Sequence, residues 1–233
     1  MAPNELFQYS TINALMEGVY HSGLTAKDVE NTGNHGLGTF KDMDGEMVVV
    51  DGKIYQMRAG GSIAEADPST IVPFVMTTDF RAAETGEFES ISKDQLFGML
   101  DVLLPKANNH YVAIRMEATF EKVTARTVRK KSAGQENSSL ADNQVVNTYS
   151  DIRGSLVGFR SPAFTQGISV AGNHIHFISE DRTRGGHVLD FQAKDARLSV
   201  AALKEVHLEL PDSDGFNKAK LVQDSESIKA VEG

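Results

Sequence analysis

The chain has 233 residues, a formal net charge of −9 and no cysteine. The acidic balance disfavours a nucleic-acid partner, whose binding surface is usually basic, and the missing cysteines exclude disulfides, thiolate catalysis and cysteine-held zinc. No apolar run reaches the roughly 20 residues that span a bilayer and residues 1–10 lack the features of a secretory signal, so we expect a cytoplasmic protein without a membrane partner.

The first part of the chain predicts short helices followed by a β-hairpin. A short helix is expected over residues 11–17, and Thr25 can cap a further helical turn. Residues 46–50 and 53–57 are suited to two strands, and they flank Asp51-Gly52. That dipeptide readily adopts the positive φ angles of a two-residue turn, so these residues predict a hairpin.

The middle of the chain contains the clearest helix signal. Ser92 and Gln95 form a capping box ahead of an apolar stripe that ends before Pro105. Apolar and polar residues then alternate over residues 111–128, which predicts one or two half-buried strands. Residues 129–144 are polar and rich in serine, asparagine and lysine, so we expect a long loop and a boundary between lobes there.

The chain after this loop predicts mostly strands, at residues 152–159, 168–178, 187–191, 198–203 and 206–210. We therefore expect an α/β (α+β) protein dominated by β-sheet, with few helices and with mixed or antiparallel sheets. Its two lobes are expected to be residues 1–145, an N-terminal α/β lobe, and residues 146–233, a C-terminal β lobe.

Three histidines are spaced so that their side chains converge. In a strand, residues two apart point to the same face, so His174 and His176 project together. If the following hairpin turns at Asp181-Arg182, His187 lies directly opposite His176 and shares its face. Three histidines with an open fourth position are typical of catalytic zinc. The sequence therefore predicts a Zn²⁺ site held by His174, His176 and His187.

Other interpretations stay open at this point. The three histidines could be polar side chains on a solvated sheet face. His174, His176 and Glu180 also fit the first motif of a cupin-like metal oxygenase or isomerase, although the second cupin motif is absent. A non-enzymatic metal-binding or carbohydrate-binding β domain is a third reading. Asp42-x-Asp44-Gly45 is similar to a fragment of a calcium loop, but its remaining ligands are missing, and a tight turn is expected instead.

Several short motifs follow one another along the chain. In the second half they are Asp151-Ile152-Arg153-Gly154, Val157-Gly158-Phe159, Gly172-x-His174-x-His176-Phe177 and Gly185-Gly186-His187-Val188-Leu189-Asp190-Phe191. In the first half they are Gly36-Leu37-Gly38-Thr39-Phe40, Asp44-Gly45-Glu46 and Asp51-Gly52-x-x-Tyr55-Gln56. Together they cover nearly the whole chain, and in this order and spacing they resemble the signature of the acetolactate decarboxylase family.

The resemblance implies zinc-dependent decarboxylation of 2-acetolactate to acetoin and CO2, through a metal-stabilised enediolate. It implies that the three histidines bind the zinc and that the chain forms a homodimer. It assigns catalytic roles to Glu46, Arg126 and Glu232 and places Thr39 in the substrate pocket, so that the C-terminal lobe carries the metal site and an active-site tail. Where the family often has a proline after the arginine, Arg129-Lys130-Lys131 follow here, so the conformation of that loop is not predicted.

The proposed chemistry suits these residue types. Loss of CO2 leaves an electron pair that the neighbouring ketone of acetolactate can accept when a Lewis acid polarises it. Arg126 offers a fixed charge for a carboxylate or an oxyanion, and Glu46 offers a carboxyl group that can deliver a proton. Without the resemblance, Glu46 would be a solvent-facing residue, Arg126 part of a solvated basic cluster, and Glu232 a frayed terminus.

Overall fold

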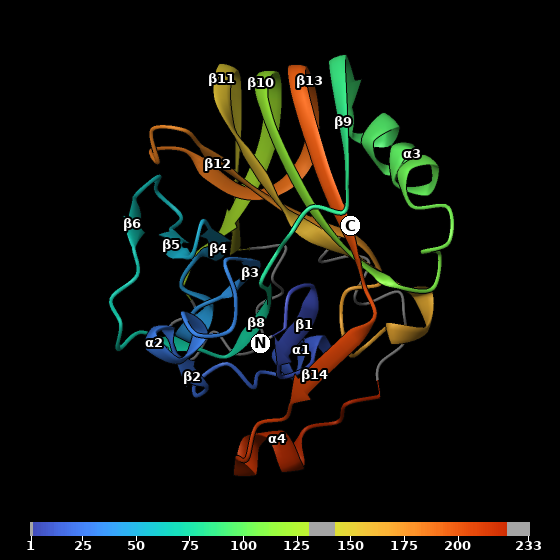
Figure 1. Ribbon diagram of the computed structural model, residues 1–233. Helices are drawn as coiled ribbons and strands as arrows, with labels where there is room; N and C mark the ends of the chain where they lie inside the picture. The colour runs from blue at the N-terminus through green and yellow to red at the C-terminus, as the bar shows by residue number, and fades with distance from the viewer. Residues whose placement is uncertain (1, 131–142, 223–233) are drawn as a thin grey trace.

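A seven-stranded mixed sheet forms the lower part of the molecule in Figure 1. The computed structural model describes residues 2–130 and 143–222. In this sheet β1 pairs in parallel with β14, and all the other pairings are antiparallel. Its strands, in spatial order, are β14 (Glu205–Glu209), β1 (Glu5–Tyr9), β8 (Phe74–Thr78), β3 (His35–Thr39), β4 (Glu46–Val50), β5 (Lys53–Met57) and β6 (Ile63–Glu65).

The second sheet has five antiparallel strands, several of them long. In spatial order they are β10 (Tyr111–Val128), β11 (Gln144–Ser161), β12 (Gly172–Ser179), β13 (Gly185–Leu203) and β9 (Glu84–Ser92). Because β10 also pairs with β13, the pairings among β10, β11, β12 and β13 form a closed circuit. In Figure 1 the long strands extend above the first sheet, with α3 beside β9.

The remaining elements are short. The helices are α1 (Ile12–Met16), α2 (Ala26–Val29), α3 (Lys93–Leu103) and α4 (Asp214–Lys218), with 3₁₀ turns at Lys41–Met43 and Ala163–Thr165. A two-stranded sheet joins β2 (Leu24–Thr25) to β7 (Ile71–Val72). No helix among the described residues is long and apolar enough to cross a membrane.

Local signals in the sequence account for several of these elements. The capping box of Ser92 and Gln95 begins α3, and Thr11 caps α1. Asp51 and Gly52, with φ angles of 53° and 78°, form the turn between β4 and β5. The predicted hairpin and both helices are therefore confirmed.

The fold class expected from the sequence is confirmed, because sheets dominate and the helices are few and short. The expected lobe boundary near residue 145 stays a prediction. The sheets themselves draw on both sides of that position, since β9 and β10 belong to the second sheet and β14 belongs to the first.

The two sheets pack together through apolar side chains of both. Val48, Val50 and Met57 of the first sheet form one buried cluster with Val157 and Ile178 of the second. Burial of this apolar surface holds the two sheets in one relative position. β3 consequently lies against β11, and β4 lies against β11, β12 and β13. The candidate site is built at that junction.

Candidate metal centre

The three histidines lie side by side on neighbouring strands. His174 and His176 lie two residues apart on β12, and His187 lies near the start of β13. His176 pairs directly with His187 across a hairpin whose turn contains Arg182, with a φ angle of 59°. The register expected from a turn at Asp181-Arg182 is confirmed.

The imidazole nitrogens of this cluster are close enough to share one ion. One ring nitrogen from each histidine lies within 4.8 Å of those of the other two. The Nε2 atoms of His174 and His176 are 3.2 Å apart, and all three side chains are buried. The cluster is thus no row of polar groups on a solvated face, and it can hold a metal ion.

A backbone carbonyl of the other sheet fixes the orientation of one ring. His176 Nδ1 donates a hydrogen bond of 2.6 Å to the carbonyl oxygen of Met47 on β4. This bond leaves Nε2 as the nitrogen that faces His174. Metal-binding histidines usually have such an outer hydrogen bond, which sets their tautomer and angle. The sequence carried no signal for Met47, because its contribution is a main-chain atom.

Burial keeps these imidazoles neutral, and a neutral imidazole is the form that binds a metal ion. Loss of hydration lowers the pKa of His176 to about 3, and the positive charge of Arg126 adds to that effect against the opposing hydrogen bond to Met47. Burial, followed by the nearby charges of His176 and Arg126, holds the pKa of His174 well below its usual range. The pKa of His187 is lowered by burial first and by Arg126 second.

Two rows of residues, one from each sheet, meet at the cluster. Arg126 on β10 pairs with His187, which pairs in turn with His176, so one row crosses three strands of the second sheet. In the first sheet Thr39 of β3 pairs with Glu46 of β4. Directly paired residues share a face of the sheet. Each row therefore directs its side chains to one side.

The predicted substrate-binding residues lie in or beside this junction. Arg126 is 2% exposed and Glu46 is 8% exposed, so neither is the solvated surface group that its local sequence would suggest. A carboxylate oxygen of Glu46 lies 3.7 Å from His176 Nε2. The Thr39 hydroxyl donates to the carbonyl oxygen of Gly45, 2.9 Å away. Glu46, Arg126, Thr39 and His174 line the same pocket.

The pocket is also lined by apolar residues that the sequence did not reveal. Its apolar lining residues are Ile12, Leu15, Met43, Phe74 and Val128. They come from four separate segments of the chain, since Ile12 and Leu15 both belong to α1, and all belong to one buried hydrophobic cluster. Only Val128 could have been anticipated, because it is two residues from Arg126 on the same strand face.

The last predicted catalytic residue, Glu232, lies outside the described residues. The nearest described part of the C-terminal segment passes α1, where the side-chain amide of Asn13 donates to the carbonyl oxygen of Leu221. Ile12 and Leu15 of the same helix line the pocket. The described chain therefore ends close to the helix that forms one wall of the site.

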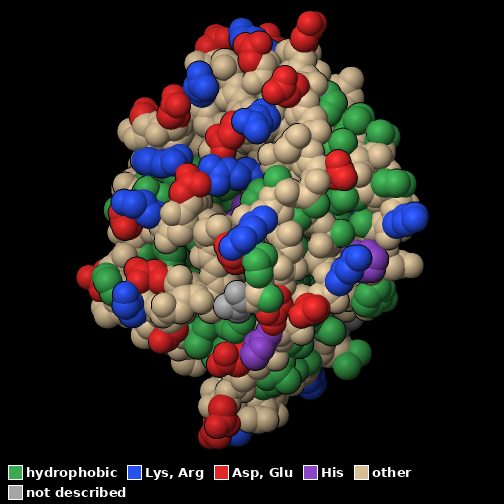
Figure 2. Space-filling model, viewed as in Figure 1, with side chains coloured by type: hydrophobic (Ala, Val, Ile, Leu, Met, Phe, Trp, Pro, Cys, Tyr) green, Lys and Arg blue, Asp and Glu red, His purple; other side chains and the backbone are tan. Residues whose placement is uncertain are grey.

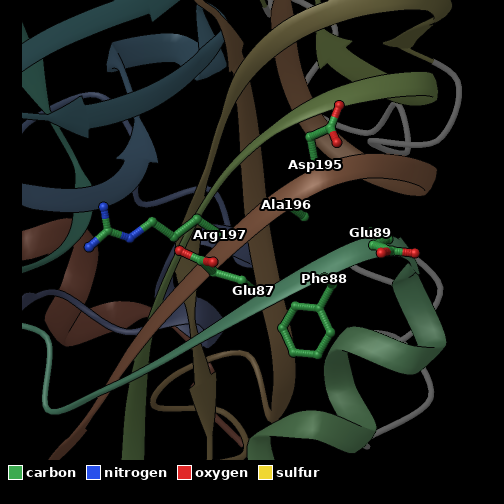
Figure 3. Close-up of a pocket in the computed structure, with 6 residues that line it drawn as sticks. All are labelled: Glu87, Phe88, Glu89, Asp195, Ala196 and Arg197. Atoms are coloured by element: carbon green, nitrogen blue, oxygen red, sulfur yellow. The ribbon is translucent and has the colours of Figure 1, made fainter.

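A second hollow, between β9 and β13, has a different character. Its lining includes Glu87, Glu89, Asp195 and Arg197, and Figure 3 shows that the carboxylates of Glu89 and Asp195 point in different directions. These acidic groups do not converge as the histidines do. On the face in Figure 2, basic and acidic side chains are interspersed rather than gathered into a basic surface.

Fold and site together define a β-rich protein with a buried histidine cluster able to hold a metal ion. The model of the alpha-acetolactate decarboxylase family matches residues 6–223. The chain is 38% identical over 222 residues to alpha-acetolactate decarboxylase of Brevibacillus brevis, covering 94% of this chain and 78% of that protein. With the protein of that name from Methanosarcina mazei it is 37% identical over 236 residues, covering 99% of this chain and 81% of the other.

A solved structure agrees with these matches. The crystal structure of alpha-acetolactate decarboxylase from Bacillus subtilis strain 168 superposes with a TM-score of 0.92 at 30% identity, and the match covers 98% of this chain and 99% of the other. The chain belongs to the alpha-acetolactate decarboxylase family. It is therefore an enzyme of the carbon–carbon lyase class, a carboxy-lyase.

Proposed function

We propose that this enzyme converts 2-acetolactate to acetoin and CO2 with a Zn²⁺ ion held by His174, His176 and His187. The observation that carries the proposal is the convergence of three buried imidazoles beside Arg126 and Glu46 in a member of this family. An anionic substrate needs positive charge in a protein whose net charge is −9, and the ion and Arg126 would supply it at this point.

The donor set suits zinc. Three neutral imidazoles without thiolate ligands are typical of catalytic zinc sites, which keep a position for water or substrate. Lowered histidine pKa values keep the rings deprotonated near neutral pH, and the bond to Met47 holds one ring in place. When bound, the ion supplies Lewis acidity toward the hydroxyl and ketone oxygens of the substrate.

Arg126 is proposed to hold the negative charge of the reacting molecule. In the reaction, the bond between the carboxylate carbon and the carbinol carbon breaks, and CO2 leaves. The electron pair of that bond is accepted by the neighbouring ketone, which gives an enediolate. A buried guanidinium stabilises the carboxylate before this step and the developing oxyanion during it, and low exposure strengthens the interaction.

Glu46 is proposed to deliver the proton that completes acetoin. Protonation occurs at the carbon that lost CO2, and a carboxyl group fixed on one side of the pocket would deliver it to one face. Glu46 begins β4, is held in register by Thr39, and lies 3.7 Å from His176 Nε2. Thr39, on the same lining, would contact the substrate.

The proposal includes further parts that rest on family resemblance. Glu232 would provide a second carboxyl group for proton transfer at the same site. The enzyme would act as a homodimer in the cytoplasm, with no nucleic-acid or membrane partner. The role of Glu232 is supported by the position of Leu221, which is hydrogen-bonded to Asn13 of α1. Ile12 and Leu15 of this helix line the pocket.

The cupin-like oxygenase or isomerase is less well supported. That alternative would use Glu180 as a ligand with His174 and His176. Glu180 is exposed, and its carboxylate lies 3.6 Å from Arg153. Among the described residues, the cluster able to hold a metal ion contains histidines alone.

The experiment that tests the proposed roles separates metal binding from chemistry. Arg126→Ala and Glu46→Gln should each retain zinc, because neither residue is proposed as a ligand. Each should lose acetoin production by about a hundredfold or more, as expected for a charge-stabilising group or a general acid. Loss of zinc from Glu46→Gln would make Glu46 a ligand, and unchanged turnover in both variants would contradict the proposal.

A further inference from the structure

The loop between β3 and β4 has an unfavourable backbone next to the pocket. Asp42 has φ and ψ angles of 60° and 24°, and the next residue, Met43, has a φ angle of 58°. Two consecutive residues with side chains rarely adopt this left-handed conformation, which costs conformational free energy at each. Such a backbone persists only where surrounding contacts hold it, and it commonly occurs beside functional sites.

Contacts hold this loop on both sides of Met43. The Asp42 carboxylate lies 2.7 Å from His21 Nδ1 and 3.7 Å from Lys130 Nζ, and its backbone amide donates to the carbonyl oxygen of Tyr20. These partners belong to the segment after α1 and to the residues just after β10. The Asp42 carboxylate therefore has partners within the protein, and the tight turn predicted for this segment is confirmed.

The second set of contacts comes from β5 and the segment after it. The Asp44 carboxylate accepts hydrogen bonds from Gln56 Nε2, at 3.1 Å, and from Arg58 Nε, at 3.0 Å. Gln56 Nε2 also donates to the Asp44 carbonyl oxygen at 2.6 Å. Met43 therefore lies between two residues that are tied to different elements.

The side chain held in this way is one of the apolar residues that line the pocket. Met43 is 5% exposed and lines the pocket together with Leu15 and Phe74. Arg126 and Glu46 line the same pocket. A substrate whose charged and oxygen-bearing groups contact these polar residues is expected to place its alkyl substituent against the apolar ones, where water is excluded.

We propose that Met43, held by Asp42, sets the size of the alkyl group that the enzyme accepts on the carbinol carbon of its 2-alkyl-2-hydroxy-3-oxo acid substrate. This inference rests on the proposed function and adds to it a residue that limits the size of the substrate. Methionine side chains fill space closely against neighbouring apolar groups. Replacing Met43 with a shorter side chain creates space for one more carbon atom of the substrate. Weakening the contacts of Asp42 lets Met43 move and creates a smaller space.

The test compares acetolactate with its homologue that carries an ethyl group in place of the 2-methyl group. The ratio of kcat/KM for the ethyl and methyl substrates is measured for the natural enzyme, Met43→Ala, Asp42→Asn and Met116→Ala. Met43→Ala should raise the ratio about tenfold, because one methylene in an apolar pocket commonly changes discrimination by that factor or more. Asp42→Asn should raise it in the same direction by a smaller factor.

Met116→Ala is the matched control, since Met116 is also fully buried but lies in the hydrophobic cluster of the second sheet. The ratio of kcat/KM for the ethyl and methyl substrates should be the same in Met116→Ala as in the natural enzyme, even if the variant is less stable. Unchanged ratios in Met43→Ala and Asp42→Asn would overturn the inference. If Met43→Ala does not fold, the ratio of Asp42→Asn decides the question alone. Inactivity of the natural enzyme on both substrates would refute the proposed function instead.

Discussion

Single residues in this protein are fixed by atoms of the opposite sheet. His176 of β12 donates to the carbonyl oxygen of Met47 on β4. His35 of β3 shows the reverse arrangement, because its Nε2 contacts the carbonyl oxygen of Gly158 on β11 at 3.2 Å. Each histidine thus joins the two sheets, but of the two only His176 belongs to the cluster that could hold a metal ion. The protonation state of His35 consequently bears on stability rather than on the ligand set.

Stability should depend on pH through His35. Burial lowers the pKa of His35 to about 4, below the ordinary value of 6.5. The unfolded chain therefore binds a proton more readily, and the stability from this neutral histidine is present above pH 6.5 and is lost as pH falls toward 4. Replacing His35 with Gln removes the titration and keeps a hydrogen-bond donor.

Denaturant unfolding at pH 7 and pH 5 measures this effect. The natural protein should lose more unfolding free energy between these two pH values than His35→Gln does, with a difference of about 2 kcal/mol. The comparison at each pH cancels the contributions of the other titrating groups, since both proteins contain them. Equal losses in the two proteins would show that His35 is not titrated on unfolding in this range.

At the scale of elements, close approach between β11 and β12 positions two of the proposed metal ligands. Gly158 pairs with Ile175, the residue between His174 and His176. A Cβ atom at position 158 would lie 2.1 Å from the His174 carbonyl oxygen and 2.7 Å from the Ile175 Cα. Backbone atoms cannot move aside as a flexible side chain can, so a glycine at this position allows the two strands to pair.

Gly158→Ala should therefore separate β11 from β12 and disturb the histidine cluster. We expect a stability loss of at least about 2 kcal/mol and weaker zinc binding, measured by thermal unfolding and by metal titration. Gly98→Ala is the matched control, because Gly98 lies in α3 with nothing within 4 Å of the added Cβ. Alanine there should stabilise the protein by about 0.5–1 kcal/mol, with zinc affinity unchanged.

Elements with strong local signals could be predicted from the sequence. The β4–β5 hairpin follows from Asp51-Gly52, and α3 follows from its capping box. By contrast, β9 was not predicted. Its segment, residues 84–92, carries three glutamates and is largely exposed at the sheet edge. It becomes a strand by pairing with β13, about a hundred residues further along the chain, and no local pattern contains that information.

The residues of the candidate site, like the elements of the fold, could be predicted only where a local pattern specifies them. The His174–His176 spacing and the return of His187 follow from strand periodicity and one turn, and the structure brings the three together. Arg126 and Glu46 required the family resemblance, because their neighbours in sequence suggest solvent exposure. Burial of these two residues arises from the packing of one sheet on the other, which a single sequence does not express.

In the whole molecule, the C-terminal segment returns to the N-terminal elements. β14 pairs in parallel with β1, and Leu221 is bound by Asn13 of α1. This path leads the chain back to the helix that lines the pocket. The path of the described residues is compatible with the proton-transfer role proposed for Glu232, which itself lies outside the described residues.

Deletion of residues 231–233 should leave folding and zinc content intact, because the described hydrophobic clusters and the proposed ligands all precede residue 223. Turnover should fall by about a hundredfold or more if Glu232 transfers a proton. The full-length variant Glu232→Gln should show the same loss, which separates the carboxyl group from the length of the tail. Unchanged acetoin production by both proteins would show that Glu46 and Arg126 act without Glu232.

We propose above all that this carboxy-lyase works through zinc bound by three histidines. The most direct measurement determines zinc content and acetoin production from acetolactate on the same samples of the natural protein and of His176→Ala. We predict about one zinc per chain and rapid acetoin formation in the natural protein, with both strongly reduced in the variant. Full turnover by His176→Ala with zinc retained, or by zinc-free natural protein, would contradict the account.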